Sequence, residues 1–180
     1  MDRLKLATVW LAGCSGCHMS FLDLDEWLLE LAAMADLVYS PVLDIKEFPE
    51  GVDVTLVEGA VANDENLEMI RLVRRRSKVL VSFGDCAVTG NVTALRNPLA
   101  SAQPVLQRSY VELADVTPAM PSDEGLLPML LDRVEPLHAI VPVDFFLPGC
   151  PPSAPEIRAV LEALVAGRAP ALAGKQIKFG

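Results

Sequence analysis

Each of the four cysteines in this 180-residue chain stands shortly after an apolar run, and these positions constrain the fold more than any other feature. Short apolar runs that end at glycine are typical of buried strands in a parallel sheet. The carboxyl ends of parallel strands lie along one edge of the sheet, where ligands bind. Four converging thiolates are the usual ligands of a cubane iron–sulfur cluster, which the pattern therefore predicts. The runs are 4–11, 79–83 and 140–147, followed by Cys14 with Cys17, by Cys86 and by Cys150 respectively.

Three other interpretations of the cysteines are open on the residues alone. A structural zinc site usually gathers two close pairs of ligands, whereas only Cys14 and Cys17 form a close pair here. A thioredoxin-like redox pair would use the same C-x-x-C but would leave Cys86 and Cys150 without a role. Buried bystander cysteines would not explain why all four stand in glycine-containing loops. The pattern as a whole favours the iron–sulfur cluster.

Two further polar residues are expected at the same edge of the sheet. His18 follows Cys17 directly, and Glu58 ends the strand expected over Val52–Val57. Imidazoles and carboxylates are the usual proton carriers of enzymes, so either residue could relay protons beside a redox centre. The alternatives are a plain loop histidine and an ordinary carboxylate at the entrance to a helix.

Strands and helices are expected to alternate, which is the plan of a doubly wound α/β domain. One such domain is expected over residues 1–180. The strands are expected over 4–11, 52–57, 78–83 and 140–147. A helix is expected over 21–35, where apolar residues form a stripe on one face. A second is expected over 63–76, where acidic residues stand at the start and arginines at the end. A third is expected to begin at a capping box of Ser153 and Glu156 and to end at Gly167.

A Pro-rich insert, about 96–137, separates the last expected strand from the rest. Four prolines stand between Arg96 and Pro121, and no sustained period is present there. A short helix is expected over 123–134, although Pro128 weakens it. A long irregular segment in a compact domain is usually functional or lies against a partner, and we expect the same of this insert.

The composition excludes two classes of partner and indicates a third. The 24 acidic residues outnumber the 15 basic ones, so binding to nucleic-acid phosphates is not expected. The longest charge-free stretch, Leu6–Leu22, is interrupted by polar residues and is too short to span a membrane. Hydrophobic residues make up 52% and charged residues 22%, which favours a permanent protein interface. A well-buried parallel sheet is the alternative explanation.

The compartment is expected to be the cytoplasm. No secretory signal is recognised before the first expected strand, and a reducing environment keeps thiols free. In such an environment four cysteines indicate metal or redox chemistry more than disulfides.

Four motifs together resemble those of the small subunit of [NiFe] hydrogenases. They are GCSGCHMS, VEGAV, FGDCAVTGN and LPGCPPS, in that order, and the resemblance covers Lys5 to about Gly167. It implies a flavodoxin-like fold and one proximal [4Fe–4S] cluster held by Cys14, Cys17, Cys86 and Cys150. The Glu-Gly of the family matches Glu58 and its neighbour. The nickel–iron centre would lie in an obligate partner, the large subunit.

Within that family the chain resembles the minimal small subunit of the cytoplasmic, bidirectional NAD-reducing hydrogenases. No cysteine remains for a further cluster, and no twin-arginine signal is recognised. The resemblance implies that electrons pass to diaphorase subunits that carry more iron–sulfur clusters, flavin and the NAD site. Small subunits of deazaflavin-reducing or sulfur-reducing hydrogenases are alternatives. A cluster subunit of an NADH:quinone oxidoreductase-like complex is another, although its first motif carries adjacent cysteines.

A flavin protein is the remaining alternative. Flavodoxins hold the phosphate of FMN with hydroxyls and backbone amides of the first loop, whereas here that loop carries Cys14 and Cys17. FMN is therefore possible in such a fold but is not supported by the first loop.

Overall fold

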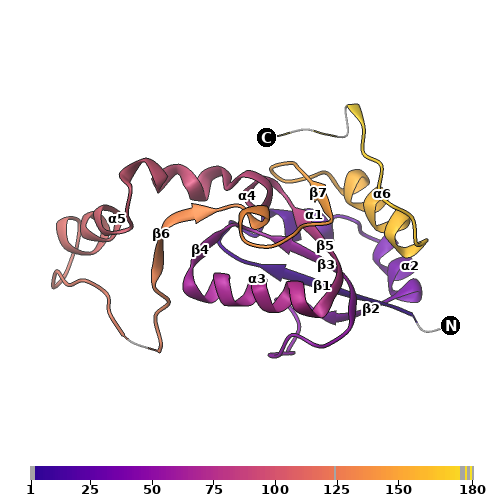
Figure 1. The fold of residues 1–180 in the computed structure, drawn as a ribbon, viewed down its shortest axis with the longest axis horizontal. Coiled ribbons are helices and arrows are strands. Elements are labelled where there is room, and N and C mark those ends of the chain that lie inside the picture. Colours follow the sequence, from indigo (N-terminus) through magenta and orange to yellow (C-terminus); the bar gives the residue numbers. More distant parts are fainter. Residues whose placement is uncertain (1–2, 124, 175–176, 178, 180) are drawn as a thin grey trace.

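Five parallel strands form the central sheet of the computed structural model, which describes residues 3–123, 125–174, 177 and 179 (Figure 1). Their spatial order is β2-β1-β3-β5-β7. Counted along the chain this order is 2-1-3-4-5, the flavodoxin-like arrangement of a doubly wound sheet, so the predicted fold class is confirmed. The strands span Leu4–Trp10 (β1), Ala35–Tyr39 (β2), Val52–Glu58 (β3), Ser77–Phe83 (β5) and Phe145–Leu147 (β7).

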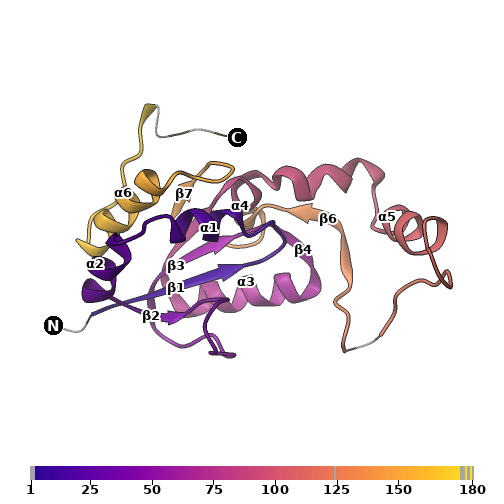
Figure 2. The ribbon, with the colours of Figure 1, turned by 180° about the vertical axis from the view of Figure 1, so that it is seen from behind.

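Helices cover both faces of this sheet, and each face has its own hydrophobic core (Figure 2). On one face Phe21, Trp27 and Ile157 pack against Leu56 and Phe83. On the other, Ile70 and Val73 belong to a core with Val9 and Leu80 of the sheet. The first face is covered by α1 (Gly16–Leu22), α2 (Trp27–Met34) and α6 (Ala154–Val165), and the second by α3 (Asp64–Arg76) and α4 (Asp85–Thr89).

The ends of two helices follow the capping residues of the sequence. The side chain of Asn63 accepts a hydrogen bond from the N–H of Asn66 at the start of α3, and three arginines occupy the last turn. Ser153 and Glu156 form the expected capping box of α6. Both helices therefore begin where polar side chains satisfy backbone N–H groups that have no partner inside the helix.

The apolar stripe over 21–35 forms two helices and a strand, where one helix was expected. The chain leaves α1 at Asp23, and Asp25 adopts a left-handed backbone with φ of 49° before α2 begins at Trp27. Phe21, Leu24 and Leu31 are buried as expected, because both helices lie on the same face. Strand β2, which the sequence did not predict, follows α2 without a loop.

Two other expectations near the end of the chain are wrong. The segment expected as a helix over 123–134 contains β6 (Leu130–Glu135), which pairs antiparallel with β4 (Val61–Asn63). The strand expected over 140–147 is reduced to β7, because the chain bends near Asp144. The Asp144 carboxylate accepts hydrogen bonds from the Leu80 N–H and the Arg74 guanidinium, which fixes that bend.

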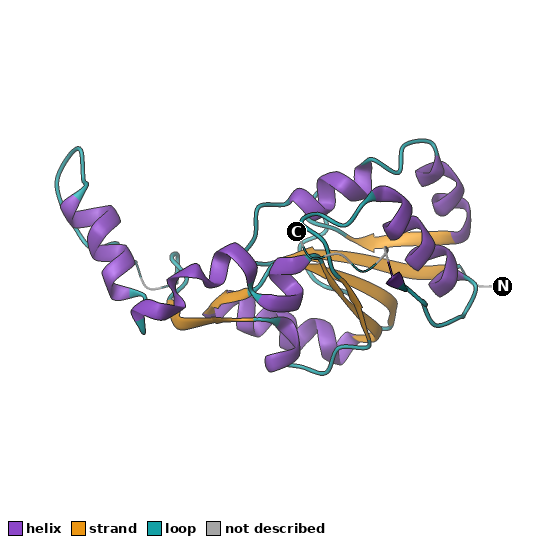
Figure 3. Ribbon diagram, turned by 90° about the horizontal axis from the view of Figure 1, so that it is seen from above, coloured by secondary structure: helices purple, strands orange, loops and turns teal. Residues whose placement is uncertain are grey.

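The Pro-rich insert projects from the sheet as an arm, here residues 91–129 (Figure 3). It is helical over much of its described length, where an irregular segment was expected. It contains η1 (Asn91–Leu99), α5 (Gln103–Gln107) and η2 (Arg108–Glu112). Pro104 is compatible with this structure because it stands in the first turn of α5, where its missing N–H is not needed.

The base of the arm is fixed to the short β4–β6 ribbon. Arg96 donates hydrogen bonds to the carbonyl oxygens of Ala62, Leu131 and Asp132. Asn97 both donates to and accepts from the backbone of Val134. Among the described residues, no helix has the length and apolarity that crossing a bilayer requires.

Candidate iron–sulfur site

The four cysteines lie in loops that leave the carboxyl ends of β1, β5 and β7. Cys14 precedes α1, and Cys17 stands in its first turn. Cys86 stands in the first turn of α4, and Cys150 follows β7. Cys17 and Cys86 are buried, Cys14 and Cys150 are exposed, and all four are free thiols. The fold therefore brings the predicted residues to one edge of the sheet, with two thiols facing inward and two outward.

The charges of neighbouring cysteines contribute to the raised pKa of the two buried thiols. Burial raises the pKa of Cys17, and the charges of Glu58 and of the other three cysteines raise it further. Burial also raises the pKa of Cys86, with smaller contributions from Cys14 and Cys150. Both inner thiols are thus protonated at neutral pH unless a cation binds them. A coordinated metal reverses this preference, because it deprotonates a thiol outright.

Backbone without side chains makes room for these thiols. Gly84 has a φ of +83°, and a Cβ built at this position would overlap the Sγ of Cys17. Gly149 has a φ of +135°, and a Cβ there would lie 2.6 Å from the backbone of Pro152. Any other residue at either position would therefore displace a cysteine or its loop. The absence of side chains at these two positions lets the cysteine loops pack closely, and the loops together form a cradle for a ligand of the four thiols.

Asp85 joins the loop of Cys86 to the loop of Cys150 by hydrogen bonds. The sequence did not predict this role. Asp85 Oδ1 accepts a hydrogen bond from the Gly149 N–H at 2.6 Å, and its own N–H donates to the Gly149 carbonyl at 2.9 Å. The sequence feature that could have indicated this role is the position of Asp85 in the FGDC motif, directly before Cys86. Because Asp85 is buried, this pair of bonds fixes the distance between the loops of Cys86 and Cys150.

A single metal ion and a cubane cluster make different demands on the positions of the thiols. Within the described part of the chain, no group of three or more histidine, cysteine or acidic side chains could hold a single metal ion. Zinc requires all of its ligands within about 2.3 Å of one centre. A cubane cluster distributes its thiolates over several iron atoms, so its ligands need not meet at one point.

His18 and Glu58, the two predicted proton carriers, meet at the same edge. His18 is 6% exposed and Glu58 is 2% exposed. Glu58 Oε2 accepts a hydrogen bond from the His18 N–H at 2.9 Å and also contacts the ring Nδ1 of His18. The rings of Trp10 and Phe83 lie against the imidazole, and its Nε2 is buried without a hydrogen-bond partner. A buried imidazole–carboxylate pair can hold and exchange a proton.

Gly59 allows the strand end that carries Glu58 to approach the first cysteine loop. Its φ is +88°, and a Cβ at this position would lie 2.8 Å from the carbonyl carbon of Leu11. The two segments are joined by hydrogen bonds from the Leu11 N–H to the Glu58 carbonyl and between Ala12 and Ala60 in both directions. The Glu-Gly pair of the sequence thus positions Glu58 beneath the loop of Cys14 and Cys17.

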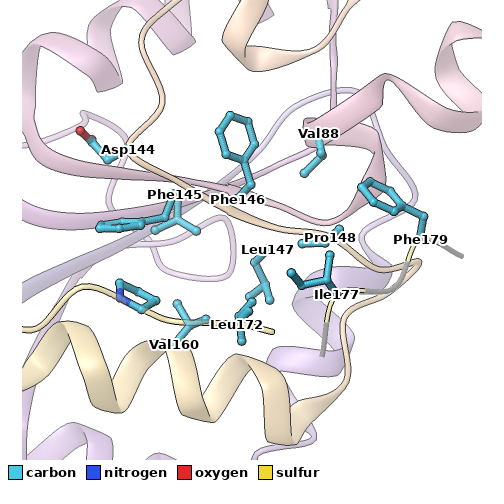
Figure 4. Close-up of a pocket in the computed structure, with 12 residues that line it drawn as sticks. Val88, Asp144, Phe145, Phe146, Leu147, Pro148, Val160, Leu172, Ile177 and Phe179 are labelled. Carbon is cyan, nitrogen blue, oxygen red and sulfur yellow. The ribbon is translucent and has the colours of Figure 1, made fainter. Parts of the chain in front are cut away.

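A separate apolar pocket lies beside the edge strand β7 (Figure 4). Phe145, Leu147, Val160 and Leu172 contribute to its walls. Of the described residues that line it, Asp144 is the charged one, its carboxylate is already bonded to the Arg74 guanidinium, and the other lining residues offer no charge to a phosphate. The pocket therefore offers no support for the FMN alternative.

Comparison with known proteins places the chain in a family. Residues 14–164 match the family described as the NADH ubiquinone oxidoreductase, 20 kDa subunit. The chain is also 40% identical over 169 residues to the delta subunit of the NAD-reducing hydrogenase HoxS of Cupriavidus necator, a match that covers 92% of this chain and 80% of that subunit. The chain belongs to the family of hydrogenase small subunits. This result confirms the resemblance inferred from the cysteine motifs and identifies the chain as a subunit of an oxidoreductase.

Two further matches describe how far the likeness extends. A chain in the crystal structure of an NAD+-reducing [NiFe]-hydrogenase in the H2-reduced state superposes on this hydrogenase small subunit with a TM-score of 0.94 and 40% identity, over 99% of this chain and 100% of that one. A subunit of the F420-non-reducing hydrogenase vhu of Methanococcus voltae is 42% identical over 177 residues. That match covers 97% of this small subunit and 60% of its relative, so the chain spans about three fifths of the length of the Methanococcus protein.

Proposed function

We propose that this chain, a single domain over residues 1–180, is the electron-transfer small subunit of a cytoplasmic [NiFe] hydrogenase that couples hydrogen to NAD(H). The convergence of Cys14, Cys17, Cys86 and Cys150 at one sheet edge carries the proposal. The similarity to an NAD-reducing hydrogenase subunit supports the choice of electron acceptor. In this proposal the nickel–iron centre belongs to a large partner subunit, and a diaphorase module carries flavin, further iron–sulfur clusters and the NAD site.

The cofactor that fits this cradle is one [4Fe–4S] cluster, which would supply one-electron transfer. The chain contributes thiols of two kinds to it. Cys17 and Cys86 are buried against the sheet, and Cys14 and Cys150 are exposed toward a docking subunit. Gly84 and Gly149 lack side chains, so the cysteine loops pack closely against each other on the inner side. The exposed side is where a partner can bring its own redox centre within reach.

Exposed apolar side chains on the arm support an obligate partner. Val92, Leu95 and Leu99 of η1 are each more than half exposed. They begin directly after Asn91, whose side chain contacts Cys150, so this apolar surface continues the exposed side of the cysteine site. Contiguous apolar surface of this kind marks protein interfaces. We assign it to the contact with the large subunit.

His18 and Glu58 are proposed as a proton relay next to the electron path. With Glu58 accepting from Nδ1, the Nε2 of a neutral His18 carries the free lone pair. Nε2 is therefore the atom through which His18 would accept and release a proton. Among the described residues, His18 and Glu58 are the pair in which two proton-exchanging side chains are both buried and in contact.

A second candidate differs in the electron acceptor alone. Similar subunits also occur in hydrogenases that are not named for NAD, among them an F420-non-reducing hydrogenase, a coenzyme F420 hydrogenase and a sulfhydrogenase. Deazaflavin- and sulfur-reducing enzymes belong to the same group of candidates. The cysteine site would be identical in each of them, because the acceptor is bound by other subunits.

The test is to purify the chain anaerobically with its co-expressed partner subunits. We expect about four iron and four sulfide per small subunit in addition to those that the partner subunits carry, which is the stoichiometry of one cubane cluster. We also expect reduction of NAD+ by hydrogen. Zinc in place of iron would refute the cluster, and hydrogen oxidation that reduces other acceptors but not NAD+ would select the second candidate.

A further inference from the structure

Asn91 connects the fourth cysteine to the base of the arm. Its Nδ2 donates a hydrogen bond to the Sγ of Cys150 at 3.4 Å. The two residues belong to different loops, since Asn91 begins η1 shortly after Cys86, and Cys150 follows β7. This contact therefore joins two of the segments that deliver thiols to the site. Nothing in the sequence pattern assigns a role to this side chain beyond its place in the FGDCAVTGN motif.

The backbone presents the Asn91 amide in an uncommon conformation. Gly90 has a φ of +88°, and its N–H donates to the Cys86 carbonyl at 3.0 Å. Asn91 itself has a φ of +36°, and its N–H donates to Thr89 Oγ1 at 3.3 Å. Positive φ is costly for most residues, and asparagine tolerates it better than most. Such conformations persist where the surroundings impose them, and they cluster at functional sites.

The arm holds this conformation from the other side. Thr93 Oγ1 donates to the Gly90 carbonyl, and the Ala94 N–H donates to the same oxygen. Farther along η1, Arg96 and Asn97 fix the helix to the β4–β6 ribbon. The Asn91 amide is thus directed at Cys150 by a helix anchored at several points.

A hydrogen bond to a thiolate ligand withdraws electron density from the sulfur and so changes the reduction potential of the bound cluster. Hydrogen bonds to the sulfurs of an iron–sulfur cluster are one of the levers by which a protein sets its reduction potential. Reduction adds negative charge to the ligand set, so a donor stabilises the reduced form more than the oxidised form. The donor at Cys150 acts on an exposed ligand, on the side away from the buried Cys17 and Cys86.

We propose that Asn91 is a positioning residue that raises the reduction potential of the cluster through its hydrogen bond to Cys150. The inference rests on the proposed function, because it requires the cluster. It goes beyond that function by naming a side chain that sets the driving force for electron transfer.

The experiment compares three variants in the purified complex, with iron and sulfide content measured first. Asn91→Gly removes the amide but suits the positive φ. Asn91→Asp keeps the size of the side chain and replaces the donor with a negative charge. Gln107→Ala is the control, since it removes an exposed side-chain amide from α5 of the same arm and leaves the bonds that anchor η1 in place. The midpoint potential is read from the EPR signal of the reduced cluster in a redox titration.

Asn91→Gly is expected to lower the ratio of reduced to oxidised cluster severalfold at a fixed potential. A tenfold fall corresponds to about 59 mV for a one-electron couple. Asn91→Asp is expected to shift the potential further in the same direction, because the added negative charge opposes the incoming electron. Gln107→Ala is expected to keep the wild-type potential.

Unchanged potentials in both Asn91 variants with full iron content would overturn the proposal. Loss of the cluster in both variants would overturn it as well, since Asn91 would then serve retention and not tuning. An equal shift in Gln107→Ala would assign the effect to the arm as a whole and not to the Asn91 amide. A wild-type complex without any cluster signal would refute the proposed function itself, a result distinct from all of these.

Discussion

His18 presents both its backbone N–H and its ring Nδ1 to a single oxygen, the Oε2 of Glu58. The register of the sheet creates this contact, because Trp10 of β1 pairs with Glu58 of β3, and the first cysteine loop then carries His18 back over the strand end. One carboxylate thus fixes the first turn of α1, which contains Cys17, and orients the imidazole. In the proposed function this buried pair combines structural support with proton exchange.

The substitution Glu58→Gln separates these two roles. The amide oxygen can still accept from the His18 N–H, so the cluster content and its spectra should not change. The loss of a titratable carboxylate should slow hydrogen turnover by about 10²-fold, the lower end of typical proton-transfer contributions. Hydrogen-driven dye reduction by the complex measures the effect.

A wild-type rate in Glu58→Gln would limit Glu58 to a structural role. Glu65 provides the control, because it is a carboxylate in the first turn of α3, away from the cysteine loops. Glu65→Gln should leave both turnover and spectra unchanged.

Gly84 should be required for cluster assembly. In Gly84→Ala the new methyl group would overlap the Sγ of Cys17, and the positive φ of +83° adds backbone strain of about 1–3 kcal/mol. We expect most chains to lack iron. Gly167→Ala is the matched control, since Gly167 has a φ of +66° with no atom near the added Cβ. Equal iron content in the two variants, measured per chain in the purified complex, would contradict the steric argument.

Local sequence signals predicted the elements that are stabilised locally. The cap at Asn63 and the capping box of Ser153 and Glu156 marked the starts of α3 and α6. Strand β6 was missed because Leu130, Leu131 and Val134 have helical spacing, while their partner β4 is distant in sequence. Strand β2 was missed because it is a short strand at the sheet edge with two exposed residues at its centre. Both strands depend on pairing that no local pattern encodes.

In the candidate site, too, the sequence predicts some features and not those that depend on contacts between distant segments. The cysteines could be predicted at one edge because strand order alone places them there. The contacts of Asp85 with Gly149 and of Asn91 with Cys150 could not be predicted, because they depend on how two loops meet in space. The contact between His18 and Glu58 likewise depends on the register of β1 against β3.

Cys86→Ala tests the electron path as a whole. The variant removes one buried thiol, so the cluster should be lost or degraded. Hydrogen-driven NAD+ reduction should collapse, while oxidation of NADH by an artificial dye in the diaphorase should continue. The rate of hydrogen–deuterium exchange catalysed by the large subunit should fall less than the rate of NAD+ reduction. That exchange does not require an electron to leave the nickel–iron centre. NAD+ reduction at the wild-type rate would end the electron-relay interpretation.

The arm should contribute to subunit assembly through its apolar face. Leu95 of η1 is 75% exposed and lies beside the cysteine site, whereas Leu29 of α2 is 76% exposed and lies on the helix layer. Leu95→Glu should weaken the complex, because a charge placed in a desolvated interface has no partner. Leu29→Glu is the control, because it introduces the same charge at a leucine of nearly equal exposure. It should leave co-purification of the large subunit unchanged. The measurement is the large-to-small subunit ratio after affinity capture at increasing salt, with circular dichroism to show that both variants are folded. Equal retention in the two variants would move the partner contact away from the arm, and stronger loss in Leu29→Glu would place it on α2.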